Sequence, residues 1–158
     1  MLNKTTQIGI KTLIFLGLYG GNDPVSPRRI AGHLGISPTY LSKITALLVK
    51  ADILVSHRGV LGGVTFSRPT SSFTLLEIIE ACQGRVTGDY CQRSEDIDKV
   101  CAFHRAMQEV HQETVEVLSR WSLADLIAKP APDEDVQSRV TCMMADIKPS
   151  VGELAATK

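Results

Sequence analysis

Residues suited to a buried face recur at helical spacing near the start of the chain. Between positions 5 and 19 they lie about three or four residues apart, at Ile8, Thr12, Phe15, Leu16 and Tyr19. This period predicts an α-helix that turns one face towards a core. The glycine-rich, polar residues 20–24 then end the helix.

Two further helices are predicted from a start signal that occurs twice. Ser26-Pro27 and Ser37-Pro38 each combine a side chain that caps free backbone N–H groups with a proline where no hydrogen bond is lost. The first of these helices ends at Gly35 and the second extends to about residue 52. Two capped helices joined by so short a turn are typical of a helix-turn-helix, although a generic helical hairpin has the same pattern.

The following residues favour a DNA-binding version of this motif. Two short β-rich runs, 53–55 and 64–66, enclose a loop that holds Arg58, Gly59, Gly62 and Gly63. A hairpin directly behind the second helix is the wing of a winged helix-turn-helix. Its glycines permit tight turns and a close approach to a phosphate backbone.

The second half of the chain contains one long predicted helix. A capping box at Thr74 and Glu77 begins a short helix that extends to Cys82, and residues 84–96 follow as a loop. Residues 97–120 form the long helix, and a short helix covers 123–128. The long helix has an apolar stripe that predicts a dimer seam, made of Val100, Phe103, Met107, Val110, Val117 and Leu118.

The predicted fold is therefore mainly α with a small β-wing. A winged helix-turn-helix domain occupies residues 1–83, a sensor loop 84–96, and a dimerisation helix with a short helix after it 97–128. Residues 129–158 contain prolines, acidic residues and small residues, which are typical of a loose tail.

The charge distribution supports this division. The 158 residues carry no net charge, yet residues 1–70 have a net charge of +6 and residues 71–158 of −6. A basic half joined to an acidic half indicates an anion-binding module beside a regulatory or assembly module. No apolar run is long enough to cross a bilayer, and residues 13–19 lack a signal-peptide cleavage site after them. We therefore expect a cytoplasmic protein without membrane contact.

Residues 36–84 resemble one family, the IscR/NsrR-type bacterial regulators (the Rrf-two family). The resemblance is carried by three segments at characteristic distances, ISPTYL at 36–41, VSHRGVLGG at 55–63 and FTLLEIIEA at 73–81. It extends more weakly over residues 1–128. It implies a homodimer in which the long helix of each protomer packs against its partner.

The start of the second helix of a helix-turn-helix faces base edges in the major groove. We expect Lys43 to donate to guanine, and Thr39 and Ser42 to bond bases or phosphates. Tyr40 offers a hydroxyl to phosphate or packs at the edge, and Arg58 suits a minor-groove or backbone contact. The full predicted DNA-binding set is Ser26, Arg28, Ser37, Pro38, Thr39, Tyr40, Ser42, Lys43, Arg58, Gly59, Gly62 and Gly63.

Candidate sensor residues lie between the two modules. Cys101 and His104 are three apart on the predicted long helix, and Cys91 in the preceding loop could fold back to them. Two thiolates and an imidazole suit an iron–sulfur cluster, [2Fe–2S] or [4Fe–4S], or zinc. A fourth ligand is then needed, from the partner subunit or from Glu95, Asp96 or Asp98.

The resemblance bears on these cysteines as well. Cluster-binding relatives have three cysteines in this region, and Cys91 and Cys101 resemble the first and last of them, whereas the middle one is absent. Some relatives place an acid on the first helix where this sequence has Gln7, a poor ligand. Cys82 on an apolar side is expected in the core, and Cys142 in the tail is expected to play no part in sensing.

The sequence thus predicts a homodimeric DNA-binding repressor of palindromic operators, modulated by an iron–sulfur cluster or by redox state at Cys91, Cys101 and His104. Its partners are double-stranded DNA, a second copy and, indirectly, RNA polymerase. A regulator without a cluster, using a thiol switch, zinc or a small-molecule effector, is the alternative. An enzyme is disfavoured because Cys101 and His104 have no orienting acid or oxyanion donors near them in the sequence. A winged helix that binds protein is disfavoured by the +6 charge of residues 1–70.

Overall fold

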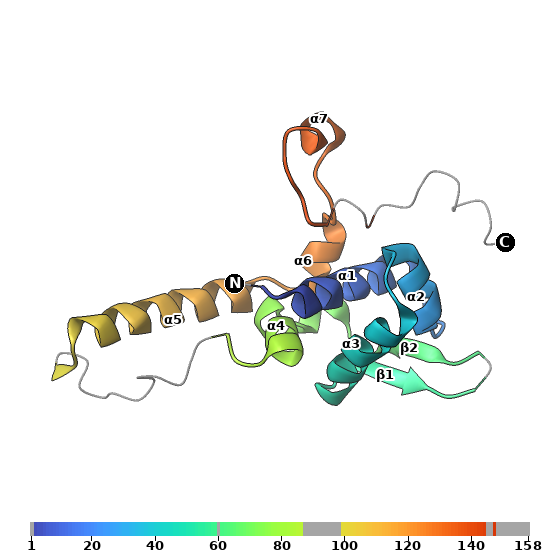
Figure 1. Cartoon of the computed structure of the whole chain (residues 1–158), viewed down its shortest axis with the longest axis horizontal. Coiled ribbons are helices and arrows are strands. Elements are labelled where there is room, and N and C mark those ends of the chain that lie inside the picture. The colour runs from blue at the N-terminus through green and yellow to red at the C-terminus, as the bar shows by residue number, and fades with distance from the viewer. Residues whose placement is uncertain (1, 60, 87–98, 145–146, 148–158) are drawn as a thin grey trace.

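The computed structural model describes residues 2–59, 61–86, 99–144 and 147. In chain order its elements are α1 (Lys4–Tyr19), α2 (Pro27–Leu34), α3 (Pro38–Lys50), β1 (Leu54–His57), β2 (Gly63–Phe66), a 3-10 turn η1 (Thr70–Ser72), α4 (Leu75–Gln83), α5 (Ala102–Arg120), α6 (Leu123–Ala128) and α7 (Glu134–Gln137). Figure 1 shows α1 to α4 and the hairpin gathered in one body, from which α5 projects. The predicted mainly helical fold with a small β-wing is confirmed.

Side chains at the helix starts act as the sequence predicts. The hydroxyls of Ser26 and Ser37 accept hydrogen bonds from the backbone N–H groups three residues on, at the starts of α2 and α3. Thr74 caps α4 in the same way, but the expected reciprocal half of its capping box differs, because the Glu77 carboxylate pairs with the Arg68 guanidinium. A complete capping box forms instead at Ser122.

The core is built around α1, which is buried on more than one side. Its residues from Ile8 to Phe15 include buried positions on every face, because α2, α3, α4 and α6 all pack against it. The prediction that only one face of α1 is buried is therefore wrong. Each of these neighbours contributes fully buried side chains, with Ile30 and Ala31 from α2, Leu41, Ile44 and Leu48 from α3, Ile78 from α4 and Leu123 from α6.

The hairpin forms where the sequence predicts it, with strands shifted by one or two residues. The antiparallel strands pair Leu54 with Phe66 and His57 with Gly63. A second contact fixes the hairpin to the helix-turn-helix: the Val25 N–H donates to the Val64 carbonyl (3.1 Å), and the Val64 N–H donates to the Val25 carbonyl (2.9 Å). The wing is thereby joined to the segment that leads into α2.

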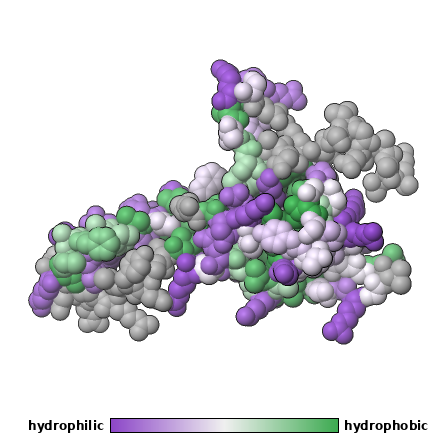
Figure 2. Space-filling model, viewed as in Figure 1, coloured by the Kyte–Doolittle hydropathy of each residue, from purple (hydrophilic) through white to green (hydrophobic). Residues whose placement is uncertain are grey.

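The long helix packs against α4, and backbone hydrogen bonds fix its C-terminal end to the body. There the Leu75 N–H donates to the Trp121 carbonyl (2.8 Å) and the Leu123 N–H donates to the Phe73 carbonyl (2.9 Å). The helix begins at Ala102 rather than at the predicted residue 97, because Cys101 has an extended backbone and precedes the first turn. Hydrophobic side chains are exposed over the projecting part of α5 (Figure 2).

No helix in the described ranges has the length and apolar character needed to span a membrane.

The described residues of the segment after α6, which the sequence predicts to be a loose tail, include a short helix and a buried side chain. The helix is α7, and the side chain is that of Ile147, which is fully buried against the body. Burial of an isolated isoleucine depends on a partner surface elsewhere in the chain, so helical or strand periodicity gives no sign of it.

Candidate nucleic-acid interface

The N-terminal half of α3 presents a polar face to solvent. A tight turn at Gly35, whose φ of 63° is left-handed, places α3 across α2. Leu41 and Ile44 fix α3 on the core, since both are fully buried. The predicted base-reading residues lie on the opposite side, and all of them are exposed: Ser37, Pro38, Thr39, Ser42 and Lys43.

Two of the predicted contact residues have a defined role within the protein. The Ser42 hydroxyl donates to the Pro38 carbonyl (2.9 Å), which leaves its oxygen lone pairs available as acceptors. Tyr40 is half-buried, and its phenol oxygen lies 3.1 Å from the Thr5 hydroxyl on α1. Tyr40 was expected either to contact phosphate or to pack at the edge, and this contact corresponds to packing.

The tip of the wing carries exposed side chains. Arg58 and Gly59 are exposed, and Leu61 is 90 % exposed. Gly59 has a φ of 112°, which other residues rarely adopt, and its carbonyl accepts the Gly62 N–H (3.0 Å). Val60 lies outside the described residues.

Gly63 makes a close backbone contact within the protein that the sequence did not predict. It is buried, and a Cβ at this position would overlap the backbone of Val25. A Cβ on Gly62 would likewise overlap the His57 carbonyl. These two glycines therefore allow the hairpin to close, in line with the predicted tight turns, and Gly63 also allows an approach to the helix-turn-helix that was not predicted.

A groove of about 670 Å³ separates α3 from the wing. Ser42 and Lys50 line it from α3, and Arg58 and Gly59 line it from the hairpin. Lys50 was not among the predicted contacts, although its position seven residues after Lys43 places both lysines on one face of the helix. The two sides of the groove thus bring cationic side chains from two elements to one surface.

The basic residues of α2 extend this surface, while another arginine does not. Arg28 and Arg29 are exposed in the first turn of α2, where the Ser26 hydroxyl caps the helix. Arg68 instead lies over the Phe73 ring, with its guanidinium carbon 4.5 Å from the ring centroid, and pairs with Glu77. The positive charge of Arg68 is therefore partly neutralised within the domain.

The predicted sensor residues are placed only in part. Cys101 is exposed at the start of α5, His104 is half-buried one turn later, and Cys91 lies outside the described residues. In the described ranges no three His, Cys, Asp or Glu side chains are arranged to hold a metal ion. Cys101 and His104 would supply two ligands, fewer than the four of a closed metal site.

Cys82, Cys142 and Gln7 lie in three different environments. Cys82 is buried in the core, and burial raises the pKa of its thiol to about 11, so it stays protonated at neutral pH. Cys142 is half-buried in the segment after α7. The Gln7 side-chain amide donates to the Leu2 carbonyl (3.1 Å).

Comparison with known proteins places this architecture among transcription regulators. The family model described as "Rrf2: Iron-dependent Transcriptional regulator" matches residues 2–129. A protein of Azotobacter vinelandii named as an HTH-type transcriptional regulator, ORF2, is 33% identical over 88% of this chain and 84% of its own length. The HTH-type transcriptional regulator IscR of Sodalis glossinidius is 25% identical over 80% of this chain and 78% of its own.

Two solved structures share the fold. CymR, the global cysteine regulator of B. subtilis, superimposes with a TM-score of 0.67 at 24% identity, covering 81% of this chain and 96% of that one. IscR of T. potens gives a TM-score of 0.65 at 24% identity, covering 90% of this chain and 92% of that one.

We predict that Gly63→Ala lowers the free energy of unfolding by about 1–3 kcal/mol, because the new methyl group must displace the Val25 backbone. Gly32→Ala is the matched control, since that glycine lies within α2 with open space around its Cβ position. The control should gain about 0.5–1 kcal/mol from helix propensity. Urea denaturation followed by circular dichroism measures both, and a Gly63→Ala protein as stable as the unmodified chain contradicts this account of the wing.

Proposed function

The chain belongs to the Rrf2 family of transcriptional regulators, and from this premise we propose that it represses transcription as a homodimer bound to a palindromic DNA operator. Membership confirms the resemblance inferred from residues 36–84 and the expectation of a DNA-binding regulator rather than an enzyme. The observation that carries the proposal is the shared groove between α3 and the wing, with Lys50 on one side and Arg58 on the other.

In this proposal the exposed start of α3 enters the major groove. Thr39, Ser42 and Lys43 reach base edges, with Lys43 as a donor to guanine O6 or N7. Ser37 and Pro38 lie at the helix N-terminus, where the first turn comes closest to the bases. Because Tyr40 bonds Thr5, its contribution is to hold α3 against α1.

Contacts outside α3 supply affinity and register. Arg58 at the wing tip binds the minor groove or its phosphates, and Arg28 with Ser26 binds phosphate at the start of α2. Gly59, Gly62 and Gly63 set the shape of the wing that presents Arg58. Repression follows when the bound dimer excludes RNA polymerase from the promoter.

The exposed face of α5 supports the homodimer. Side chains at alternating spacings of four and three residues form what we call the α5 seam: Phe103, Val110, Val117 and Trp121, which are exposed, and Met107 and Thr114, which are half-buried. Two residues of the predicted stripe lie outside this seam, because Leu118 is buried in the core and Val100 precedes the helix. Phe103 is 67% exposed and Val110 is 53% exposed, which is costly for apolar groups that stay in water. This spacing is that of a coiled coil, so a second copy of α5 is the partner that fits it. Two-fold symmetry then places the DNA half-sites about one helical turn apart.

The effector site is proposed at the start of α5. Cys101 and His104, together with Cys91 and a fourth group, would hold an iron–sulfur cluster. Such a cluster would join the loop that holds Cys91 to the start of α5, and this connection would be sensitive to iron and oxidants. The donor types fit, since thiolates bind both irons of a cluster and imidazole replaces them in some centres. A regulator without a cluster, in which the same residues form a thiol switch or bind zinc, or which responds to a small molecule, is the second candidate.

Replacing Arg58 by alanine should weaken operator binding about tenfold and reduce the slope of log affinity against log salt concentration by about 1, because one cationic contact to DNA is lost. Arg139→Ala is the control, since Arg139 is exposed beside α7 and donates to the Asp135 carbonyl in that segment. The operator is first selected from a random duplex pool, and fluorescence anisotropy over a salt series gives both quantities. Equal affinity and slope for Arg58→Ala and Arg139→Ala would remove the wing from the interface.

Val110→Glu should raise the dimer dissociation constant by at least about tenfold, because it places a charge inside an apolar seam. Gln112→Glu adds the same charge at an exposed position two residues away, outside the α5 seam, and should leave the dimer intact. Sedimentation equilibrium measures the dissociation constants, and circular dichroism verifies that both variants fold. A Val110→Glu protein that dimerises as tightly as Gln112→Glu excludes the α5 seam as the interface.

Protein purified without oxygen should contain stoichiometric iron and acid-labile sulfide, and Cys101→Ala should lose both. Cys142→Ala is the matched control, because Cys142 lies in the segment after α7 and should not affect the cluster. Metal analysis, sulfide assay and the visible spectrum provide the readout. Iron-free, colourless protein after attempted reconstitution would favour the second candidate and leave the DNA-binding assignment in place.

A further inference from the structure

The tip of the wing carries an apolar side chain that the protomer leaves in water. Leu61 is 90% exposed, the highest exposed fraction among the large apolar side chains of the described ranges, and Phe103 follows at 67%. Phe103 belongs to the α5 seam, for which a second copy is the proposed partner, whereas Leu61 lies in the hairpin that Figure 1 shows reaching out from the body beside α3. A leucine exposed to this extent adds almost nothing to the stability of the fold, so its apolar surface is available to another molecule.

The turn that contains Leu61 is braced from both strands of the hairpin. The Gly62 N–H donates to the Gly59 carbonyl (3.0 Å) and closes the turn. Behind the turn, His57 Nε2 lies 2.8 Å from the Thr65 hydroxyl on the opposite strand, and the second strand is bridged to the segment that leads into α2. The backbone on either side of the tip is thus held in place, so presenting Leu61 to a partner costs little ordering entropy.

The charges around Leu61 indicate what kind of partner fits it. Residues 53–67, which include the whole hairpin, contain Arg58 but no aspartate or glutamate. Arg58 is exposed three residues before Leu61, and Lys50 lines the groove between the hairpin and α3. An apolar tip in basic surroundings fits a partner that is anionic at its rim and apolar within. The minor groove of DNA has this character, since phosphates flank walls of deoxyribose C–H groups, and minor-groove proteins insert leucine there.

We propose that Leu61 enters the minor groove of the operator and makes the protein prefer A·T pairs under the wing. This inference rests on the proposed function and adds to it a residue that reads sequence without a hydrogen bond. Arg58 remains the cationic contact of the wing, and its contribution to affinity weakens as the salt concentration rises. The contribution of Leu61 comes from buried apolar surface and does not depend on released counterions.

The preference for A·T follows from the floor of the minor groove. A G·C pair places the 2-amino group of guanine on this floor, whereas an A·T pair presents acceptor atoms alone. The amino group takes up space that the leucine side chain would fill. Covering it with an apolar side chain also removes the water that its N–H groups bond, which costs free energy.

Truncation of Leu61 tests its contact with DNA. On an operator selected with the unmodified chain, Leu61→Ala should lower the affinity by at least about fivefold, because less apolar surface is buried. The slope of log affinity against log salt concentration should stay unchanged, since no cationic contact is lost. Leu61→Met keeps the apolar volume and should retain most of the affinity. Fluorescence anisotropy over a salt series measures both quantities, and circular dichroism verifies that the variants fold.

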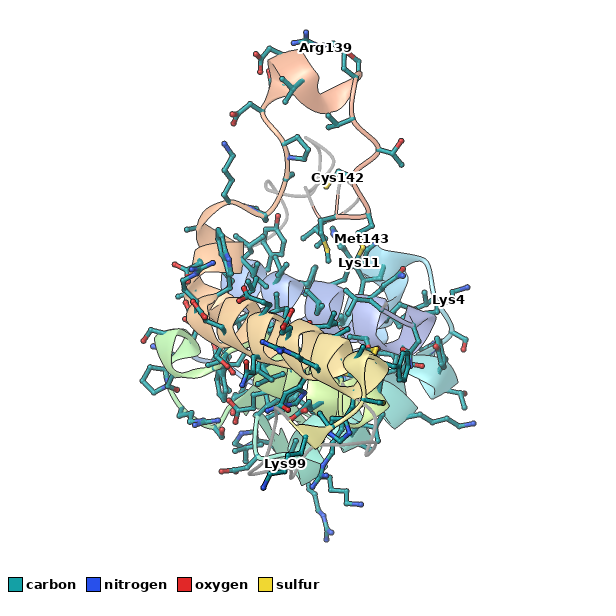
Figure 3. All side chains as sticks on the ribbon, turned by 90° about the vertical axis from the view of Figure 1, so that its left-hand side faces the viewer. Lys4, Lys11, Lys99, Arg139, Cys142 and Met143 are labelled. Carbon is teal, nitrogen blue, oxygen red and sulfur yellow. The ribbon has the colours of Figure 1, made fainter. Side chains whose placement is uncertain are left out.

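Val140→Ala is the matched control, because it truncates an exposed apolar side chain away from the hairpin. Val140 is 48% exposed and follows Arg139, which Figure 3 shows at the outer end of the segment after α6. Figure 1 places this segment and the hairpin on opposite sides of α1. The control should bind the operator as tightly as the unmodified chain does.

Substituted operators test the preference for A·T. The I·C pair lacks the 2-amino group but keeps the major-groove edge of G·C, so it isolates what is read in the minor groove. In a scan of the operator, G·C under the wing should bind about tenfold more weakly than I·C at the same position. In Leu61→Ala this penalty should fall to about twofold or less.

The outcomes separate this inference from the proposed function. Failure of the unmodified chain to select any duplex overturns both. If Arg58→Ala weakens binding but Leu61→Ala does not, or if the penalty for G·C is equal in both proteins, Leu61 does not enter the minor groove and the regulator assignment stands. Selection of G·C pairs under the wing has the same meaning. A Leu61→Ala protein with unchanged DNA affinity and an altered mass in sedimentation assigns the tip to a protein contact and likewise overturns the inference.

Discussion

The backbone bridge between Val25 and Val64 is the contact on which the DNA-facing geometry depends. It joins the hairpin to the segment that leads directly into α2, through two hydrogen bonds of 3.1 and 2.9 Å. The bridge is possible only because Gly63 has no Cβ to strike Val25. Since α2 is in turn tied to α3 by the turn at Gly35, the wing and the proposed recognition helix occupy fixed positions relative to each other. Arg58 and Lys50 can therefore line a single groove.

Local signals allowed much of this fold to be predicted from the sequence. Ser26 and Ser37 cap helices as expected, because a cap depends on residues only three positions away. The start of α5 was placed five residues too early, since the apolar stripe continues past the point where Cys101 turns the backbone into an extended conformation. The stripe alone contains no signal for that change.

Features that depend on distant parts of the chain were not predictable in the same way. Gly63 contacts a backbone segment 38 positions earlier in the sequence, so its role as a spacer could not be separated from contact with phosphate. The single buried Ile147 is another case, because its site is assembled from α1 and α2. The exposed polar residues of the proposed interface were easier to find, since the helix period alone assigns Thr39 and Lys43 to the side opposite Leu41 and Ile44.

The attachment of α5 constrains how a signal at Cys101 could reach the DNA-binding surface. Backbone hydrogen bonds fix the C-terminal end of α5, at Trp121, to the start of α4, whereas Cys101 lies at the projecting end, about 30 Å away at the rise of an α-helix. Within one protomer α5 packs against α4, and this contact does not join Cys101 to the recognition helix of the other protomer. In the proposed dimer the α5 seam packs against a second helix, and a shift of one seam against the other would alter the separation of the two recognition helices. In the proposed function, sensing at Cys101 and dimerisation through α5 are therefore parts of one mechanism, because the first would act on DNA binding through the second.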